Sequence, residues 1–193
     1  MKKAAHNGPP FLLVRDDPEQ SESENASTAN RSLMTTKVLS AFFVLGMAIG
    51  AAAQSLHDSD LKMLTGAWTG ELVYLDYQSK KPVTLKCNLN IRKKADSAWT
   101  FGFKYPDEPK ADRSSEVLLS ADGRTFDDEQ ITDVSRRRGQ LRIVTSRIGS
   151  DDNKAAEIRH TYLLAKHALS IKKEVRFEGA GEWFERNTYR WKK

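Results

Sequence analysis

The chain has 193 residues and a formal net charge of +5 at pH 7. Its only cysteine, Cys87, excludes an internal disulfide, and we interpret it as a buried thiol on a strand. Basic and acidic residues are mixed along nearly every segment, which argues against the dense basic stripe of a nucleic-acid-binding protein.

The first candidate element is an apolar run near the N-terminus. Residues 38–53 carry no charge, follow Lys37 and end in three alanines before Gln54. A basic start, an apolar run and small residues are the parts of a secretory signal peptide, and the run is shorter than the ~20 residues of a spanning helix. We therefore predict a signal peptide over 34–53, export to the periplasm or the extracellular space, and no stable membrane span after cleavage.

The segment before this run does not fit a signal peptide. Residues 1–33 are rich in serine, glutamate and asparagine and show little apolar periodicity, which is typical of a disordered segment. Met34 would be an ordinary start for the signal peptide. We interpret 1–33 as an over-extended reading frame. The alternative is a disordered cytoplasmic tail on an uncleaved anchor.

The remaining chain, 54–193, is predicted to be a single domain. A short amphipathic piece over 57–64 indicates one or two helical turns. Apolar and polar residues then alternate without a fault over 83–92, and they alternate again over 98–105. A period of two residues indicates half-buried strands. The other expected strands are 68–77, 115–120, 125–134, 140–148, 156–165, 168–177 and 183–191.

The connections between these strands define the fold class. Each is a short turn rich in glycine, aspartate or proline, so consecutive strands must be antiparallel neighbours. Closing such a sheet on itself removes its exposed edges. The sequence therefore predicts an all-β fold, an antiparallel up-and-down barrel of about eight to ten strands with a short N-terminal helix.

A short motif at the first strand supports the barrel. Gly66-Ala-Trp68, directly after the helical piece, resembles the Gly-x-Trp opening of lipocalin-like (calycin) barrels. The resemblance implies that Trp68 plugs the closed end of the barrel. It also implies that a basic residue of the last strand, Arg186 or Arg190, packs across the indole ring as a cation–π contact. The sequence lacks the helix that follows the barrel in true lipocalins, and it lacks their usual disulfide, so no characterised family is assigned.

Aromatic residues provide the candidate ligand-binding site. Trp99, Phe101, Phe103, His160 and Tyr162 lie on strand faces that should point inward. In a hollow barrel they would line a cavity for a small apolar ligand, and in a filled barrel they would be core. A lone inward histidine is more often a hydrogen-bonded core residue. The alternative is that His160 ligates a haem inside the barrel, as in some lipocalin-like proteins.

Other groups of residues in the sequence give little support for a catalytic, metal-binding or cofactor-binding site. The runs 127–129 and 151–153 are acidic but lack the ligand spacing of a calcium loop, so we interpret both as solvated turn charges. The sequence contains no Gly-x-Ser-x-Gly motif, phosphate loop, metal-type Cys/His spacing or dinucleotide fingerprint. We therefore predict no catalytic residue, no metal and, apart from the haem alternative, no cofactor.

The leading functional hypothesis is an exported module that binds a small apolar ligand inside the barrel. One alternative is a structural or protein-interaction module with a filled core. A second alternative is an enzyme of lipocalin-like fold, for which His160 beside Tyr162 is the only hint of converging groups. An enzyme is the less favoured hypothesis, and the sequence defines no oligomeric state.

Overall fold

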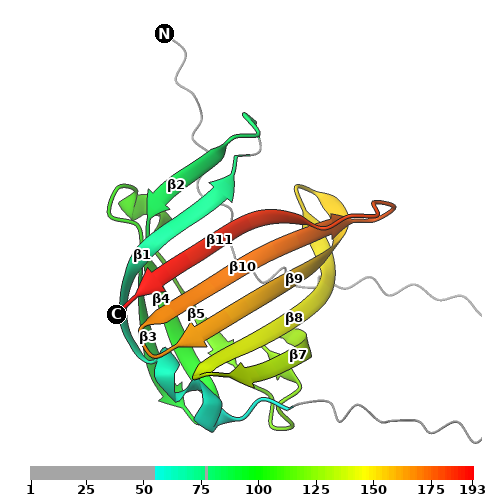
Figure 1. The fold of residues 1–193 in the computed structure, drawn as a ribbon. Coiled ribbons are helices and arrows are strands. Elements are labelled where there is room, and N and C mark those ends of the chain that lie inside the picture. The colour runs from blue at the N-terminus through cyan, green and yellow to red at the C-terminus, as the bar shows by residue number, and fades with distance from the viewer. Residues whose placement is uncertain (1–54, 77) are drawn as a thin grey trace, which may run out of the picture. The chain divides into compact units, whose positions relative to one another are not determined.

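The computed structural model describes residues 55–76 and 78–193, which form one antiparallel sheet curled into a nearly closed barrel (Figure 1). The predicted signal peptide over 34–53 and the segment 1–33 lie outside the described residues, so export stays a prediction from the sequence. Within the described ranges, no helix is long and apolar enough to cross a membrane.

Two short 3₁₀ helices accompany eleven strands. The helices are η1 (Asp58–Leu64) and η2 (Pro109–Ala111). The strands are β1 (Gly66–Leu75), β2 (Pro82–Lys86), β3 (Asn88–Ala95), β4 (Ala98–Lys104), β5 (Arg113–Leu118), β6 (Thr125–Phe126), β7 (Glu129–Arg137), β8 (Gln140–Asp151), β9 (Lys154–Ala165), β10 (Ala168–Phe177) and β11 (Phe184–Lys192).

The strands follow a simple up-and-down path. Their order is β5-β4-β3-β1-β11-β10-β9-β8-β7-β6, with β2 also paired to β1, and every pairing is antiparallel. The two ends of this path meet at an isolated bridge between Leu119 and Phe126, beside a hydrogen bond of 2.8 Å from the Asp127 backbone N–H to the Leu118 carbonyl. The predicted antiparallel barrel is confirmed.

Two of the predicted strands are each split in two. The expected strand 83–92 becomes β2 and β3, both paired to β1, and at the break the Cys87 backbone N–H donates to the Gly70 carbonyl (2.8 Å). The expected strand 125–134 is interrupted by Asp127 and Asp128, whose φ angles of +56° and +61° suit a two-residue hairpin turn. The structure therefore has more strands than the alternation alone suggests.

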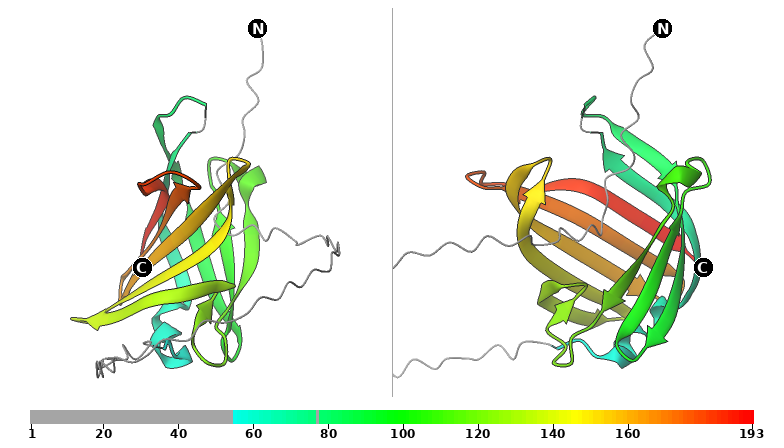
Figure 2. Two further views of the ribbon diagram at one scale, coloured as in Figure 1. Left: turned by 90° about the vertical axis from the view of Figure 1, so that its right-hand side faces the viewer. Right: turned by 180° about the vertical axis from the view of Figure 1, so that it is seen from behind.

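Helix η1 lies across one end of the barrel, which we call the η1 end (Figures 1 and 2). Its apolar side chains Leu61 and Leu64 are buried in the core. The Asp58 carboxylate ties the helix to the β3–β4 turn, because it accepts the backbone N–H of Ser97 (3.0 Å) and pairs with Lys93 Nζ (2.8 Å). At the opposite end, the far end, the β8–β9 hairpin and the β10–β11 connection reverse the chain.

Register across five strands arranges the inner face into rows. Strands β8, β9, β10, β11 and β1 pair so that their inward residues lie side by side. The first row, nearest η1, is Leu141, Leu164, Leu169, Trp191 and Gly70. The second row is Ile143, Tyr162, Ile171, Tyr189 and Leu72. The third, which we call the polar row, is Thr145, His160, Lys173, Asn187 and Tyr74, and all five are buried.

Candidate functional site

The residues predicted to bind ligand all lie in the barrel interior. Trp99, Phe101 and Phe103 alternate inward on β4, and His160 and Tyr162 do so on β9. Each is at most 5% exposed. Period-two alternation therefore identified the inward face of both strands correctly.

A further ring joins β4 to β9. Phe126 packs edge-on against Trp99, with 6.5 Å between ring centroids, and against Tyr162 at 5.3 Å. Tyr162 in turn lies 6.3 Å from the His160 ring. These four rings form one chain of contacts across the interior. Phe126 is not among the candidates predicted from the sequence, because the alternation predicts one long strand over 125–134 and not a turn directly after Phe126.

The other two predicted rings belong to a second aromatic group. Phe103 packs against Phe101 at 6.5 Å and against two rings of β11, Tyr189 at 5.7 Å and Trp191 at 6.2 Å. Tyr189 and Trp191 are stacked, with centroids 5.0 Å apart. The five predicted residues thus lie in two groups of rings, and β4 contributes to both.

Polar atoms border the second aromatic group. The hydroxyls of Tyr105 and Tyr189 are 2.9 Å apart, and Arg113 Nη2 donates to the Tyr189 hydroxyl at 3.1 Å. The same guanidinium lies over the Phe103 ring, 4.4 Å from its centroid. Burial raises the pKa of both tyrosines, so both phenols are neutral donors or acceptors at ordinary pH.

His160 is held by a buried carboxylate. Glu129, only 3% exposed, places Oε2 at 2.8 Å and Oε1 at 3.0 Å from His160 Nδ1. The Thr145 hydroxyl donates to the same carboxylate, and Arg147 Nε donates to it at 3.2 Å. This pairing fixes the orientation of the imidazole ring and leaves Nε2 as its other polar atom.

The environment of Glu129 favours its charged form. Burial raises the pKa of this carboxyl, but the hydrogen bond and charge of His160, the Thr145 hydroxyl and the charge of Arg147 outweigh burial, so the pKa lies below its ordinary value of 4.5. From the sequence, residues 127–129 are interpreted as solvated turn charges. That interpretation is wrong for Glu129, because the turn occupies only residues 127 and 128 and β7 begins at Glu129.

A second buried carboxylate lies toward the far end. Asp151 accepts from Lys173 Nζ at 2.7 Å and pairs with Arg186 Nε at 3.2 Å, and the three side chains are at most 8% exposed. Burial lowers the pKa of Arg186 to about 10. Asp151 was also predicted to be a solvated turn charge. Instead it ends β8, and only residues 152 and 153 form the turn.

Several buried polar atoms of the interior have no hydrogen-bond partner within the part of the chain that the structure describes. Among the described residues, His160 Nε2, both amide atoms of Asn187 and the Ser115 hydroxyl lack a hydrogen bond. His160 and Asn187 belong to the polar row, and Ser115 lies on β5, paired with Phe101 of β4. The unpartnered atoms therefore come from both walls of the barrel.

The Gly66–Trp68 motif is found at the η1 end. Trp68 is 1% exposed, and its Nε1 donates to the Leu64 carbonyl of η1 at 2.8 Å. Gly66 has a φ of +133°, and a Cβ there would lie 3.2 Å from Cε of Lys193. The cation over the indole ring is Lys193, with Nζ 4.3 Å from the centroid.

The two arginines expected at this contact lie elsewhere. Arg190 is on the outer face, 3.9 Å from Glu71. Arg186 is buried near Asp151, because β11 has a bulge opposite Lys173 that turns an additional side chain to the inner face. The assignment of Arg186 or Arg190 to the Trp68 ring is therefore corrected, since Lys193 follows the last strand and takes that place.

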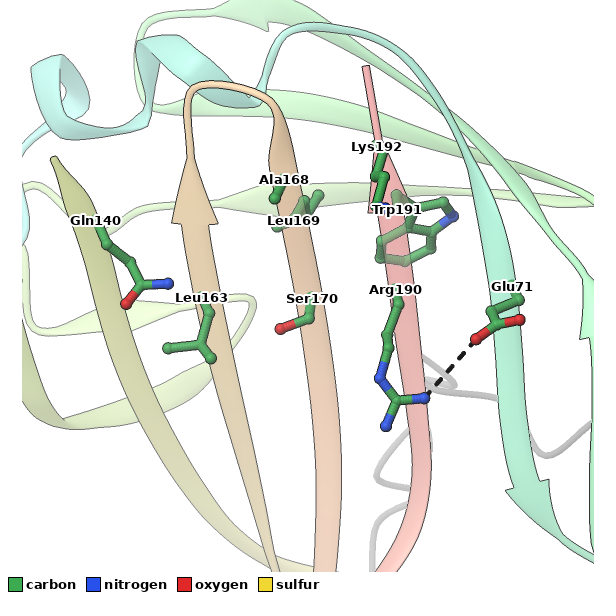
Figure 3. A pocket seen from close by; sticks show the side chains of 9 residues that line it. All are labelled: Glu71, Gln140, Leu163, Ala168, Leu169, Ser170, Arg190, Trp191 and Lys192. Carbon is green, nitrogen blue, oxygen red and sulfur yellow. Dashed lines mark ion pairs between the residues drawn. The ribbon is translucent and has the colours of Figure 1, made fainter.

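Two surface pockets lie away from the predicted ligand-binding residues. A groove of about 590 Å³ on the outer wall is crossed by the Arg190–Glu71 pair (Figure 3). Its lining residues are Glu71, Gln140, Leu163, Ala168, Leu169, Ser170, Arg190, Trp191 and Lys192. A second pocket of about 380 Å³ lies between η1 and the β7–β8 turn.

Among the described residues, no three His, Cys, Asp or Glu side chains are grouped so as to hold a metal ion.

Comparison with known proteins supports the fold alone. No family model and no curated protein matches the sequence. The structure is similar to Rv2717c from M. tuberculosis, with a TM-score of 0.51 and 12% identity over 72% of this chain and 99% of that one. Weaker similarities are to a mutant of the fluorescent protein UnaG (TM-score 0.36, 12% identity, 69% and 96% covered) and to a DUF3598 protein of unknown function from Nostoc punctiforme (TM-score 0.33, 10% identity, 72% and 49% covered). The likeness to Rv2717c supports the barrel fold, and no family is assigned.

Proposed function

We propose that the interior of this barrel binds a small ligand whose apolar body contacts the aromatic residues of β4 and β9. The observation that carries the proposal is the hydrogen bonding of the His160 ring. Its Nδ1 is fixed on Glu129, while its buried Nε2 has no partner among the described residues. Buried polar atoms in folded proteins are almost always hydrogen-bonded, so such an atom marks a place for a ligand or a water.

A neutral apolar dye tests this proposal. N-phenyl-1-naphthylamine, which fluoresces in apolar surroundings, is expected to bind at one site per chain. Ser115→Phe should abolish binding while the protein stays folded, because the added ring occupies the interior. Ser114→Phe is the matched control, since Ser114 is the next residue of β5 and is exposed. Fluorescence titration measures binding, and circular dichroism monitors the fold.

Two results would count against an interior site. Dye binding that persists in the Ser115→Phe variant would place the site elsewhere on the molecule. No dye binding, together with unfolding of Ser115→Phe but not of Ser114→Phe, would indicate a filled core, since overpacking a well-packed core is destabilising. A structural or protein-interaction module would then be the better hypothesis.

A haem ligated by His160 is a second candidate, and the geometry of one residue favours it. Histidines that bind metals usually hold their other ring nitrogen on a carboxylate or carbonyl, as His160 does with Glu129. An unpartnered Nε2 on a ring oriented in this way suits an axial ligand of haem iron. Iron coordination would come from His160, and the rings of Tyr162 and Phe126 beside it would contact the macrocycle.

Haem titration distinguishes this candidate from a purely apolar ligand. Adding haem to the purified protein should give a Soret band that His160→Ala removes. His167→Ala should leave the band unchanged, because His167 is exposed in the β9–β10 turn. The same Soret band in the wild type and in His160→Ala would rule out His160 as the ligand.

A further inference from the structure

The η1 end carries a group of exposed basic side chains, which we call the basic surface. Its members are Arg137 and Arg138 of the β7–β8 hairpin, Lys166 of the β9–β10 turn, and Lys192 at the end of β11. The register from β7 to β11 places both turns and the end of β11 at one edge of the wall. The β7–β8 hairpin projects from the wall at this edge (Figure 2).

The acidic side chains that line the two adjoining hollows are already paired. Asp60, in the pocket between η1 and the hairpin, accepts from Arg136 Nε at 2.9 Å and from the His57 backbone N–H at 2.8 Å. Glu71, in the outer-wall groove, lies 3.9 Å from Arg190. Among the residues that the structure describes, none of the four side chains of the basic surface forms an ion pair. The basic surface therefore presents four cations that are open to an anionic partner.

The shape of this region suits an extended polypeptide. The pocket of about 380 Å³ has Met63 and Leu141 among its lining residues, together with Arg138 of the basic surface. The outer-wall groove of about 590 Å³ continues from the pocket, because Gln140 lines both, and Lys192 lines the groove (Figure 3). A chain lying along these hollows places carboxylates against the cations and an apolar side chain in the pocket.

Other polyanions match the basic surface less well. Proteins bind bilayers through protruding apolar side chains beside basic ones. The two large hydrophobic side chains that are exposed in the described part of the chain, Leu118 and Ile148, belong to β5 and β8 and lie outside the basic surface. Single-stranded nucleic acid stacks its bases on accessible aromatic rings. Of the described residues that line the two hollows, the only aromatic one is Trp191, which is 2% exposed.

We infer that the basic surface binds an acidic segment of a partner polypeptide, whose carboxylates pair with the four cations and whose apolar side chain enters the pocket beside Met63. The two arginines are suited to this role, because a guanidinium group binds a carboxylate through two parallel hydrogen bonds. This docking surface is on the outside of the barrel, so the inference stands apart from the proposed interior site. Added salt should weaken the binding, since exposed ion pairs are screened.

A fluorescein-labelled peptide of repeating Glu-Glu-Leu units tests the inference by fluorescence anisotropy at low ionic strength. The wild type should bind it at least about tenfold more tightly than the Gln-Gln-Leu counterpart. Arg137→Gln combined with Arg138→Gln should lower the affinity for the acidic peptide about tenfold, because two ion pairs are lost.

Lys80→Gln combined with Lys81→Gln is the matched control. It removes the same charge from exposed residues of the β1–β2 turn, which lies away from η1 (Figure 1), so it should leave the affinity nearly unchanged. Lys166→Gln combined with Lys192→Gln is a second test that leaves the β7–β8 hairpin intact, and it should lower the affinity several-fold. Circular dichroism monitors the fold of each variant.

Three results would overturn the inference. Equal binding of the acidic and neutral peptides would exclude recognition of carboxylates. Equal loss of affinity in the Arg137/Arg138 and Lys80/Lys81 double variants would indicate a response to net charge alone. Phosphatidylglycerol vesicles or oligothymidylate that bound more tightly than the peptide, and lost this binding in the arginine variant, would assign the basic surface to a membrane or to nucleic acid instead.

Discussion

Trp68→Ala is expected to lower the free energy of unfolding by about 3–5 kcal/mol, the range for deleting a large buried aromatic side chain. Trp68 is 1% exposed and joins β1 to η1 through its hydrogen bond to Leu64. Its ring also supports Lys193, whose ammonium group donates to the carbonyls of Met63 and Thr65 at 2.9 Å each. Removing the indole therefore loosens the strand, the helix and the C-terminus together.

Chemical denaturation of the wild type and of Trp68→Ala measures this effect. Trp183→Ala is the matched control. Trp183 lies half-buried on the outer face, between the guanidinium groups of Arg159 and Arg176 at 4.2 and 4.9 Å from its ring. Its loss should cost only about 1 kcal/mol, as for exposed cation–π contacts. If the Trp68 variant were no less stable than the Trp183 variant, the plug role implied by the Gly-x-Trp resemblance would be excluded.

Glu129→Gln is expected to lower the free energy of unfolding by about 3 kcal/mol at neutral pH, because it removes one partner from a buried ionic cluster. His160 Nδ1 and Thr145 can still donate to the amide oxygen, but Arg147 loses its counter-charge. Glu157→Gln is the control. Glu157 pairs with Arg176 on the outer face and is more exposed, so its replacement should cost about 1 kcal/mol or less.

The Glu129 effect should depend on pH. The folded protein holds the pKa of this carboxyl below 4.5, its ordinary value. A lowered folded-state pKa contributes stability that is complete above the unfolded-state pKa and is lost as pH falls through the folded-state value. The difference in unfolding free energy between the wild type and Glu129→Gln should therefore be largest near neutral pH and shrink below about pH 4.5. A difference that stayed constant over this range would show that the charge of Glu129 is not what stabilises the cluster.

The alternation of apolar and polar residues predicts much of the barrel. It does not predict the buried polar side chains of the interior. Alternation specified the inward faces of β4 and β9, and with them all five candidate ligand-binding residues. It failed where acidic residues flank two-residue turns. Glu129 and Asp151 adjoin pairs of turn residues with positive φ, Asp127-Asp128 and Asp152-Asn153, so each run was read as one solvated turn. The positions of the turn residues show that both carboxylates belong to strands.

A bulge explains the other missed feature. Counting by two along β11 gives Asn187, Tyr189 and Trp191 an inward position, but it gives Arg186 an outward one. The additional residue opposite Lys173 changes the phase, and burial of Arg186 follows. No residue type in this stretch marks a bulge, so only the register of the strands reveals it. Lys193 was missed for a simpler reason, since it lies beyond the end of the last strand.

The junction between β5 and β6 gives this barrel a seam. Most neighbouring strands pair over six or more positions, and β8 and β9 pair over eleven. At the seam, the backbone pairing among the described residues is limited to the Leu119–Phe126 bridge and the adjacent hydrogen bonds. Local opening of a folded protein occurs where the fewest interactions must break. We therefore expect local opening of the barrel wall to begin at this seam, beside Phe126.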